Sequence, residues 1–201
     1  MHQKVVETEA AIQAAFIALL QTKAFEKISV SDITKLAHIN RGTFYLHYVD
    51  KYALLDHYEN HLIDQIQDYF TNDFEGTMTY QSVKENGVYT YPVVQKTVGF
   101  IHQEFALWQV LLGLNGDPRF ELKLKRIMKQ AISNGLDRVK GDISVTRCIP
   151  EDYAWELIIS GMFTIIKTWL REDDPQNPEA IADIMMKTRF LSPYDLLGIK
   201  D

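Results

Sequence analysis

The sequence is almost devoid of cysteine, because Cys148 is the only one among 201 residues. A fold held together by disulfides is therefore excluded, and a lone thiol fits a reducing compartment. The chain also opens without a signal peptide, since residues 1–9 are polar and contain no apolar segment. These two absences predict a cytoplasmic protein.

Long apolar runs are missing as well. The most apolar stretch, residues 155–170, contains Glu156 and Lys167 and is too short to cross a bilayer comfortably. Hydrophobic residues nevertheless make up 46% of the chain, which is enough to offset chain entropy and build a core. We expect a globular protein of one average or two small domains, with no membrane partner.

The sequence motifs of common enzymes are absent. We find no P-loop, no dinucleotide fingerprint and no Gly-x-Ser-x-Gly elbow, and Cys148 has no His or acidic neighbour. His57 and His61 are four residues apart with Asp64 one turn on, a spacing that can place three ligands on one metal. A solvated helix face is the simpler interpretation, because no further Cys or His is near. We predict no catalytic residue, no metal and no cofactor.

The chain also lacks an excess of basic residues, because it contains 21 Lys and Arg against 27 Asp and Glu, which gives a formal net charge of −6. The charge is unevenly spread, however. Residues 1–57 hold six basic and six acidic side chains, so the rest of the chain carries the whole −6. Two domains with different partners would explain this pattern, although charge also fluctuates along any chain.

Apolar residues recur at helical spacing along most of the chain, and no strand alternation is visible. Ile12, Phe16 and Leu20, for example, share one face of a long first helix. Residues 71–91 are polar and aperiodic, which is typical of a mobile or functional loop. We expect an all-α fold with helices at about 4–22, 33–37, 41–47, after Asp50, and at 92–104, 106–114, 118–140, 151–170 and 178–190.

The first fifty residues contain three helices, two of them only about two turns long. Ser29 or Ser31 can cap the second helix, Asn40 the third and Asp50 the helix that follows. A three-residue turn separates the second helix from the third, which is the layout of a helix-turn-helix. In that motif the short helix at residues 41–47 enters the DNA major groove. The plain alternative is that these helices only build a core.

Side chains expected to face outward on this segment have the chemistry that DNA contacts require. Arg41 can fork onto a guanine, Thr43 can meet a thymine methyl group or a phosphate, and Leu46 can supply an apolar contact. The side chains of Tyr45, His47 and Lys51 suit phosphates. The predicted DNA-binding residues are Ser31, Asn40, Arg41, Gly42, Thr43, Tyr45, Leu46, His47 and Lys51.

The same segment resembles the TetR family of transcriptional regulators. The residues that carry the resemblance are Phe25, the run Ile-Ser-Val-Ser-Asp-Ile at 28–33, the run Gly-Thr-Phe-Tyr at 42–45, and His47-Tyr48-x-Asp50-Lys51. One departure is His38, because the family commonly has glycine in this turn. A non-glycine residue can adopt the left-handed conformation there at a cost of about 1–2 kcal/mol. Weaker similarity at 160–163 and 167–170 points to a Gram-positive branch that includes dihydroxyacetone kinase operon regulators.

The resemblance implies a helix-turn-helix DNA-binding domain at residues 1–50 and a helical effector-binding and dimerisation domain at 51–201. It further implies a homodimer, most often a repressor, that binds a palindromic double-stranded DNA operator and responds to an unknown small-molecule effector. Two recognition helices about 34 Å apart read more bases than one short helix can. The alternative is a ligand-sensing coactivator on the same fold that does not bind DNA.

The later helices supply candidates for the implied pocket and dimer interface. Aromatic side chains could line the pocket, although at helical spacing they also build ordinary cores. The pocket candidates are Tyr69, Phe70, Phe100, His102, Phe105, Trp108, Trp155 and Phe163. Faces rich in small and apolar residues could pair two copies, or could instead be intramolecular core. The interface candidates are Leu157, Gly161, Thr164, Ile165, Thr168, Ile181, Ile184, Met185 and Thr188.

Overall fold

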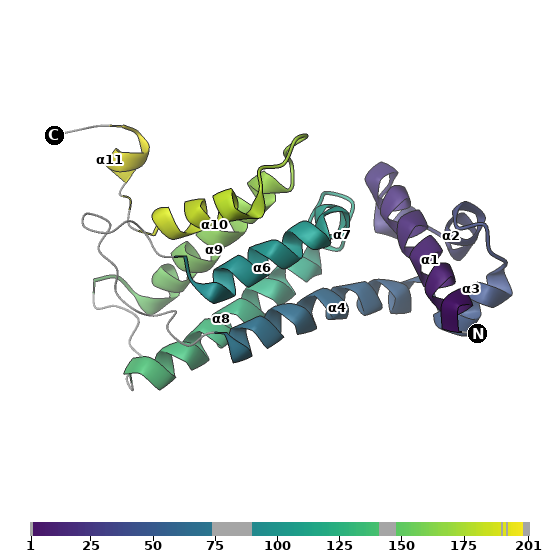
Figure 1. Ribbon diagram of the computed structural model, residues 1–201, viewed down its shortest axis with the longest axis horizontal. Coiled ribbons are helices and arrows are strands. Elements are labelled where there is room, and N and C mark those ends of the chain that lie inside the picture. Colours follow the sequence, from purple (N-terminus) through teal and green to yellow (C-terminus); the bar gives the residue numbers. More distant parts are fainter. Residues whose placement is uncertain (1, 74–89, 141–147, 190, 192, 199–201) are drawn as a thin grey trace. The chain divides into compact units, whose positions relative to one another are not determined.

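The computed structural model of the chain describes residues 2–73, 90–140, 148–189, 191 and 193–198 (Figure 1). Across these residues the chain forms helices and no strand, which confirms the expected all-α fold. The elements are α1 (His2–Thr22), the 3-10 helix η1 (Phe25–Lys27), α2 (Val30–Leu36), α3 (Arg41–His47), α4 (Lys51–Asn72), α6 (Pro92–Gln103), α7 (Phe105–Leu111), α8 (Pro118–Lys140), α9 (Glu151–Trp169), α10 (Pro178–Lys187) and α11 (Pro193–Leu196).

The helices begin where the sequence offers a cap. Asn40 Oδ1 accepts a hydrogen bond from the Thr43 N–H at 2.7 Å, and α3 starts at the next residue. The Asp50 carboxylate accepts from the Ala53 N–H at 2.8 Å just before α4. Both expected caps are confirmed. At α2 the cap is Ser29 and not Ser31.

Two helices are shorter than expected, and one expected loop is seen only at its ends. Helix α7 ends at Leu111 because the chain then turns tightly: a Cβ on Gly116 would lie only 2.2 Å from the Leu111 carbonyl oxygen. Helix α10 ends at Lys187 instead of 190. Of the loop expected at 71–91, residues 74–89 lie outside the described part of the chain.

The chain divides into two compact units. The first contains Met1–Gln65 and Ala106–Leu124, and the second contains Ile66–Phe105 and Lys125–Asp201. Helices α4 and α8 each begin in the first unit and end in the second. The first unit therefore adds α7 and the start of α8 to the predicted helix-turn-helix region, while the functional boundary expected at residue 50 stays a prediction.

The core of the first unit is built on α1. Helix α1 packs against α2, and α2 against α3. The ring of Phe16 on α1 lies 6.2 Å from that of Phe25 and 5.5 Å from that of Tyr58 on α4, measured between ring centroids. Trp108 on α7 and Phe120 on α8 form a second aromatic contact at 6.0 Å. These aromatic contacts stabilise the core of the unit to which α2 and α3 belong.

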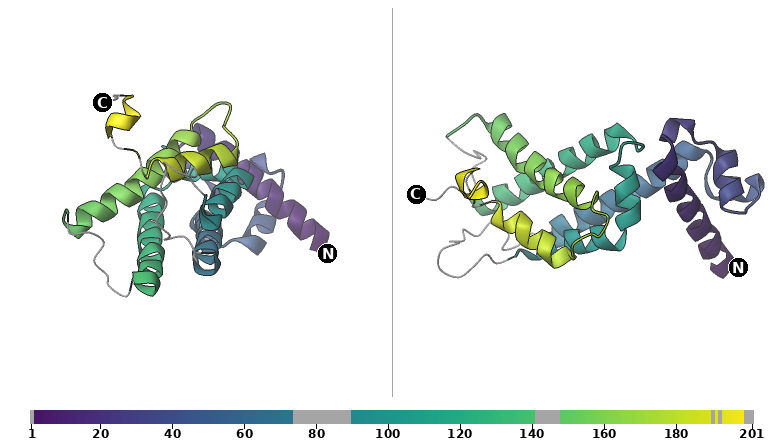
Figure 2. Two further views of the ribbon diagram at one scale, coloured as in Figure 1. Left: turned by 60° about the vertical axis from the view of Figure 1, so that its left-hand side comes forward. Right: turned by 90° about the horizontal axis from the view of Figure 1, so that it is seen from above.

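In the second unit α10 packs against both α6 and α9 (Figure 2). Trp169 at the end of α9 is fully buried, and its ring stacks on His102 and meets Phe105 edge-on. Its indole N–H donates to the Gln176 carbonyl at 2.8 Å, so the polar end of the ring is satisfied. Within the described part of the chain, no helix has the length and apolarity needed to cross a membrane.

Candidate functional site

The turn between α2 and α3 is held in a left-handed conformation by His38. Its φ is 55°, and within the described residues it is the only non-glycine residue with a positive φ. The Ile39 N–H donates to the Thr34 carbonyl at 3.0 Å and closes the turn. The position expected to carry glycine therefore has the geometry that favours glycine, with an exposed imidazole in its place.

One side of α3 faces solvent and the other faces the core. Phe44 and Tyr48 are buried, whereas Arg41, Tyr45 and Leu46 are exposed, Leu46 to 85%. Val49, which the sequence analysis missed, is 78% exposed. It follows the extended C-cap residue Tyr48, beyond the end of α3, so helical spacing gave no signal for it. An exposed short helix with a basic, an aromatic and an apolar side chain has the properties of a DNA-reading element.

Arg41 and Tyr45 contact each other along the exposed side of α3. The Arg41 Nη2 donates to the Tyr45 hydroxyl at 3.3 Å, and its Cζ lies 5.9 Å from the centroid of the Tyr45 ring. This contact restricts the guanidinium before any ligand arrives. A restricted side chain loses less conformational entropy on binding.

The remaining predicted residues of α2 and α3 have mixed roles. Ser31 and Gly42 are exposed, as expected. Thr43 is half-buried, and its hydroxyl donates to Asn40 Oδ1 at 3.1 Å, so Asn40 serves the helix start with two accepted hydrogen bonds. A contact from Asn40 to DNA would have to use its amide nitrogen.

His47 does not face outward, and that expectation was wrong. Its side chain is only 14% exposed, and Nδ1 lies 3.5 Å from Glu9 Oε1 on α1. The reason is position: three residues after Phe44, His47 stands on the side of α3 that packs against the rest of the unit. A phosphate contact by His47 stays a prediction, and it would compete with Glu9.

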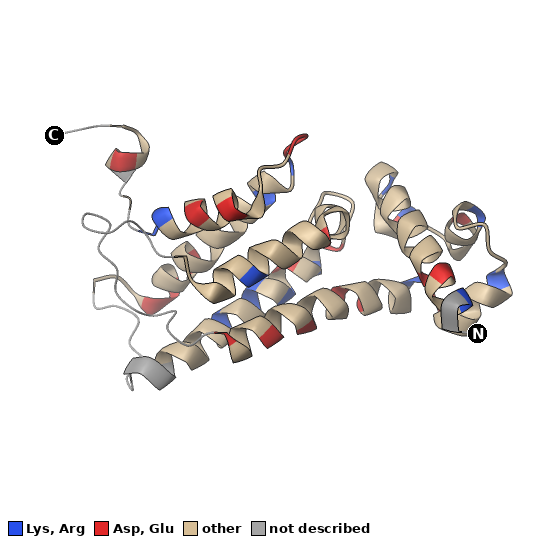
Figure 3. Ribbon diagram, viewed as in Figure 1, with Lys and Arg blue, Asp and Glu red and all other residues tan. Residues whose placement is uncertain are grey.

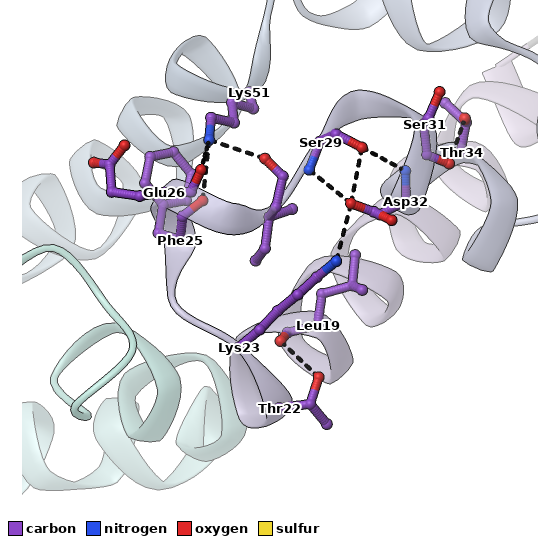
Figure 4. Close-up of polar contacts among 11 residues, drawn as sticks. Leu19, Thr22, Lys23, Phe25, Glu26, Ser29, Ser31, Asp32, Thr34 and Lys51 are labelled. Atoms are coloured by element: carbon purple, nitrogen blue, oxygen red, sulfur yellow. Dashed lines mark hydrogen bonds and ion pairs between the residues drawn. The ribbon is translucent and has the colours of Figure 1, made fainter.

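Lys51, at the first position of α4, also points into the protein. Its ammonium donates to the carbonyl oxygens of Phe25, Glu26 and Ile28 at 3.1, 2.9 and 2.9 Å (Figure 4). The rings of Phe25 and Tyr52, which contact each other edge-on, lie 4.7 and 5.2 Å from it. The sequence predicted a phosphate contact for this side chain. In the structure its ammonium instead donates to backbone carbonyl oxygens around η1.

The start of α2 is fixed by a reciprocal cap. The Asp32 N–H donates to Ser29 Oγ at 3.2 Å, and the Ser29 N–H donates back to the Asp32 carboxylate at 2.9 Å. Lys23 at the end of α1 lies 2.9 Å from the same carboxylate (Figure 4). The hydrogen bond from Lys23, aided by those from Ser29, lowers the pKa of Asp32 to about 2.

A buried carboxyl group lies on α4 in the same unit. Glu59 is 5% exposed, and its Oε1 has no hydrogen-bond partner. Burial raises the pKa of Glu59 to about 7, with Asp117 and Asp56 raising it further and Lys123 opposing them. The ammonium of Lys123 does not pair with it but donates to Asn60 Oδ1 at 2.8 Å.

The eight predicted pocket residues do not surround one cavity. Trp108 belongs to the first unit, where it packs on Phe120. In the second unit, Tyr69 meets Phe100 edge-on at 6.1 Å, and His102 and Phe105 pack on Trp169. The rings of Trp155 and Phe163 lie beneath the ammonium groups of Lys129 and Lys125. Most of these aromatics build core contacts, as the alternative interpretation allowed.

The second unit instead contains a cavity of about 710 Å³ between the end of α4 and helices α6, α8, α9 and α10. Of the predicted pocket residues, only Phe70 lines it. Its walls are mostly apolar, and Arg189 is the one charged residue among the lining residues that the structure describes. The lining also includes Tyr91, Val93, Val94, Ile132, Leu136, Leu157, Ile158, Gly161, Met162, Thr164, Ile165, Met185, Met186 and Thr188.

The predicted dimer residues divide between exposed and buried positions. On α9, Leu157, Gly161, Thr164 and Thr168 form an exposed stripe. On α10, Ile181 and Met185 are buried within the single chain, because α10 packs against α6 and α9. Ile165, Ile184 and Thr188 are half-buried. Of the predicted interface, a face of α9 is therefore exposed in the single chain, whereas Ile181 and Met185 already belong to the core.

Two other features expected from the sequence can be located. His57 packs its ring against Tyr48 and Tyr58 at 5.4 Å, and His61 is exposed one turn further along α4. Among the described residues, no group of three or more His, Cys, Asp or Glu could hold a metal ion. The basic residues of α8 stand out in Figure 3, and two of them cover the aromatic rings of α9.

Two family models match the chain. The model described as "Bacterial regulatory proteins, tetR family" matches residues 12–58, and the model described as "Transcriptional regulator C-terminal region" matches residues 89–189. The first covers the second half of α1, α2, α3 and the start of α4, and the second covers α6 to α10. Both describe transcriptional regulators, not enzymes.

Relatives agree with this assignment. An uncharacterized HTH-type transcriptional regulator, YxbF, from Bacillus subtilis is 25% identical over 94% of this chain and 47% of its own length. The dhaKLM operon transcriptional activator DhaS from Lactococcus lactis is 32% identical over 55% of this chain and 61% of its own. The chain thus matches about half of the length of these relatives.

Solved structures share the fold. A TetR transcriptional regulator from Streptococcus agalactiae has a TM-score of 0.53 at 24% identity, over 93% of this chain and 96% of its own. The fatty acid degradation regulator FadR from Bacillus halodurans has a TM-score of 0.60 at 15% identity, over 90% of this chain and 93% of its own. With α2 and α3 in helix-turn-helix arrangement and both family models matching, the chain belongs to the TetR family of bacterial transcriptional regulators.

Proposed function

We propose that the protein is a repressor that binds an inverted-repeat operator as a homodimer and is modulated by a small-molecule effector. The observation that carries the proposal is the exposed side of α3, on which Arg41, Tyr45 and Leu46 stand free of the core. Exposed groups of this kind contribute base contacts, while helix N-termini favour phosphate.

A homodimer is supported by the exposed stripe of α9. Leu157 is 70% exposed, and a Cβ added to Gly161 would meet no other atom within 4 Å. An apolar side chain this exposed costs free energy in water, and covering it with a second copy removes that cost. Two copies also double the number of base pairs read.

An effector site is supported by the cavity in the second unit. Its volume of about 710 Å³ falls in the range of small-molecule pockets, and its walls are mostly apolar. Helix α4 is continuous from Lys51, after the recognition helix, to Phe70 at this cavity. An effector that binds one position of α4 more tightly than another would change the separation of the two recognition helices.

The test is an in-vitro selection of genomic duplex fragments by the purified protein without effector, at about 0.15 M salt. Recovery of one inverted repeat is the expected result, and genes beside it would nominate the effector. Recovery of nothing above a random-DNA control would contradict the proposal and favour the coactivator. Because the relative DhaS is named an activator, a reporter gene behind the selected repeat decides the sign of regulation.

Arg41 provides the residue-level test of DNA reading. Arg41→Ala should relax the base preference at one position of each half-site and cost about 1–3 kcal/mol of binding free energy. Competition binding with duplexes substituted at each position measures both quantities. Unchanged affinity together with unchanged base preference would remove Arg41 from the reading set.

A further inference from the structure

The ammonium group of Lys51 has no donor left for DNA. A lysine ammonium has three N–H donors. All three have carbonyl acceptors at hydrogen-bond distance: Phe25 at 3.1 Å, and Glu26 and Ile28 at 2.9 Å (Figure 4). A phosphate contact would have to replace one of these bonds. The Phe25 carbonyl also accepts the Ile28 N–H at 3.0 Å, and a cation at the C-terminal end of the short helix η1 is favoured electrostatically.

The surroundings hold the ammonium in place. Phe25 is buried, and its ring lies 4.7 Å from the nitrogen, while the ring of Tyr52, which meets the Phe25 ring edge-on, lies 5.2 Å from it. The Tyr52 hydroxyl donates to the Glu26 carboxylate at 3.5 Å. The acceptor segment is fixed independently, since the Phe25 N–H donates to the Asn115 carbonyl at 2.9 Å.

The bonds of Lys51 join the two ends of the helix-turn-helix. Ile28 lies just before the Ser29 cap of α2, and Lys51 begins the helix that follows α3. The contact from Lys51 Nζ to the Ile28 carbonyl therefore closes a loop of chain that contains α2, the His38 turn and α3. Closing a loop at its ends restricts the orientations of what it contains.

From this geometry we propose that Lys51 is a positioning residue for DNA reading: it orients α3 by pinning the start of α4 to residues 25–28, and it does not bind phosphate. The inference rests on the proposed DNA reading by α3. A positioning role predicts three results that differ from those expected if Lys51 bound phosphate. Affinity should fall mainly for the specific duplex, the salt dependence should be unchanged, and a cation of similar reach should restore function.

The experiment compares the full-length wild type, Lys51→Met, Lys51→Arg and the control Lys27→Met. Lys27 is an exposed lysine in the same segment, so its replacement removes the same charge close by. The probes are the duplex that the wild type selects and a random-sequence duplex of equal length. Dissociation constants are measured from about 0.05 to 0.3 M salt, at a temperature at which circular dichroism shows each variant folded.

Lys51→Met should weaken binding to the selected duplex about tenfold or more and lower its preference over random DNA by a similar factor. The slope of log K against log salt should stay within about 0.3 of wild type. Lys51→Arg should restore the preference to within about threefold, and Lys27→Met should change neither preference nor melting temperature. Loss of about 0.9 in the slope would show a phosphate contact and overturn the proposal.

Two further outcomes would also overturn it. One is a Lys51→Met protein with wild-type preference and affinity, whether or not its melting temperature falls, because Lys51 would then serve stability alone. The other outcome is measured on the wild-type protein, so it tests the proposal even if Lys51→Met does not fold. The ¹⁵N ammonium resonance of Lys51, assigned by its loss in Lys51→Arg, should stay in place when the selected duplex is added, and a large shift would show a change of partner. Failure to select any duplex would instead contradict the proposed function.

Discussion

The side chain at position 38 decides how much strain the turn before the recognition helix stores. His38 holds a φ of 55°, where a Cβ crowds the following carbonyl at a cost of about 1–2 kcal/mol. Its imidazole is exposed, so little packing compensates for that cost. Glycine adopts the conformation freely but loses more entropy on folding, by about 0.5–1 kcal/mol.

His38→Gly should therefore raise the free energy of unfolding by up to about 1 kcal/mol. His38→Val should lower it by about 1 kcal/mol or more, because a β-branched residue is strained at positive φ. Urea denaturation followed by circular dichroism measures both changes. A glycine variant less stable than the wild type would show that the imidazole makes a contact that compensates for its conformation.

Glu59 makes the stability of the first unit depend on pH. Its pKa is about 7 in the folded protein, above the ordinary value of 4.5, because burial disfavours the carboxylate. The folded state therefore holds the proton more tightly than the unfolded state. Stability from this group is fully present below about pH 4.5 and is lost as pH rises through 7, by up to about 3 kcal/mol.

Glu59→Gln should remove this loss, so that the variant exceeds the wild type in stability by a margin that grows from pH 5 to pH 8. Thermal melts at several pH values measure the margin. The control is Asp173→Asn, which neutralises an exposed acid in the loop after α9 and should give no such trend. A margin that stays constant with pH would mean that Glu59 titrates normally.

At the scale of the element, the two short helices of the helix-turn-helix depend on their caps. Helices α2 and α3 have seven residues each, which is too short for stable helices in water on propensity alone. The Ser29–Asp32 cap and the Asn40 cap satisfy N–H groups that would otherwise be orphaned. Burial of Ile33 and Phe44 then anchors each helix to the core.

Asp32→Ala should destabilise the protein by about 1–2 kcal/mol at pH 7, because the carboxylate half of the α2 cap and the Lys23 ion pair are both lost, while Ser29 Oγ still accepts the backbone N–H of residue 32. The effect should shrink as pH falls through 2, where the wild-type carboxylate, whose pKa is lowered to about 2, becomes protonated. Lys23→Met removes only the ion pair and should cost less. Equal losses for both variants, measured by chemical denaturation, would assign the stabilisation to the ion pair alone.

At the scale of the whole molecule, the proposed dimer depends on the exposed stripe of α9. Six of the nine predicted interface residues also line the cavity: Leu157, Gly161, Thr164, Ile165, Met185 and Thr188. The proposed interface and the proposed effector site thus share the surface of α9 and must be tested separately. Sedimentation reports on the first, and ligand titration reports on the second.

Leu157→Glu should convert the proposed dimer to a monomer, because a buried carboxylate without a partner is strongly unfavourable. The affinity for the full inverted repeat should then fall about a hundredfold or more, since the second half-site is no longer held nearby. Leu122→Glu on α8, at a leucine that is also exposed, to 62%, should leave both unchanged. Sedimentation velocity that shows a Leu157→Glu dimer would place the interface elsewhere.

The sequence by itself determined the helices, the caps and the family. Periodicity, Asn40, Asp50 and the prolines are local signals, and local geometry decides where a helix starts. It also located the recognition helix at Arg41–His47, whose bounds the structure reproduces. The left-handed turn at His38 could be anticipated from the glycine that the family commonly has at this position, which implies a positive φ.

Tertiary structure alone decided which way the candidate side chains point. Lys51 and His47 have the right chemistry for phosphate, but the first meets carbonyls 23 to 26 residues earlier in the chain and the second meets Glu9 on α1. Most of the aromatic residues predicted for the pocket are likewise buried, and Met185 is covered by neighbouring helices. Periodicity shows that a helix has an apolar face, but it carries no information about which distant segment packs against that face.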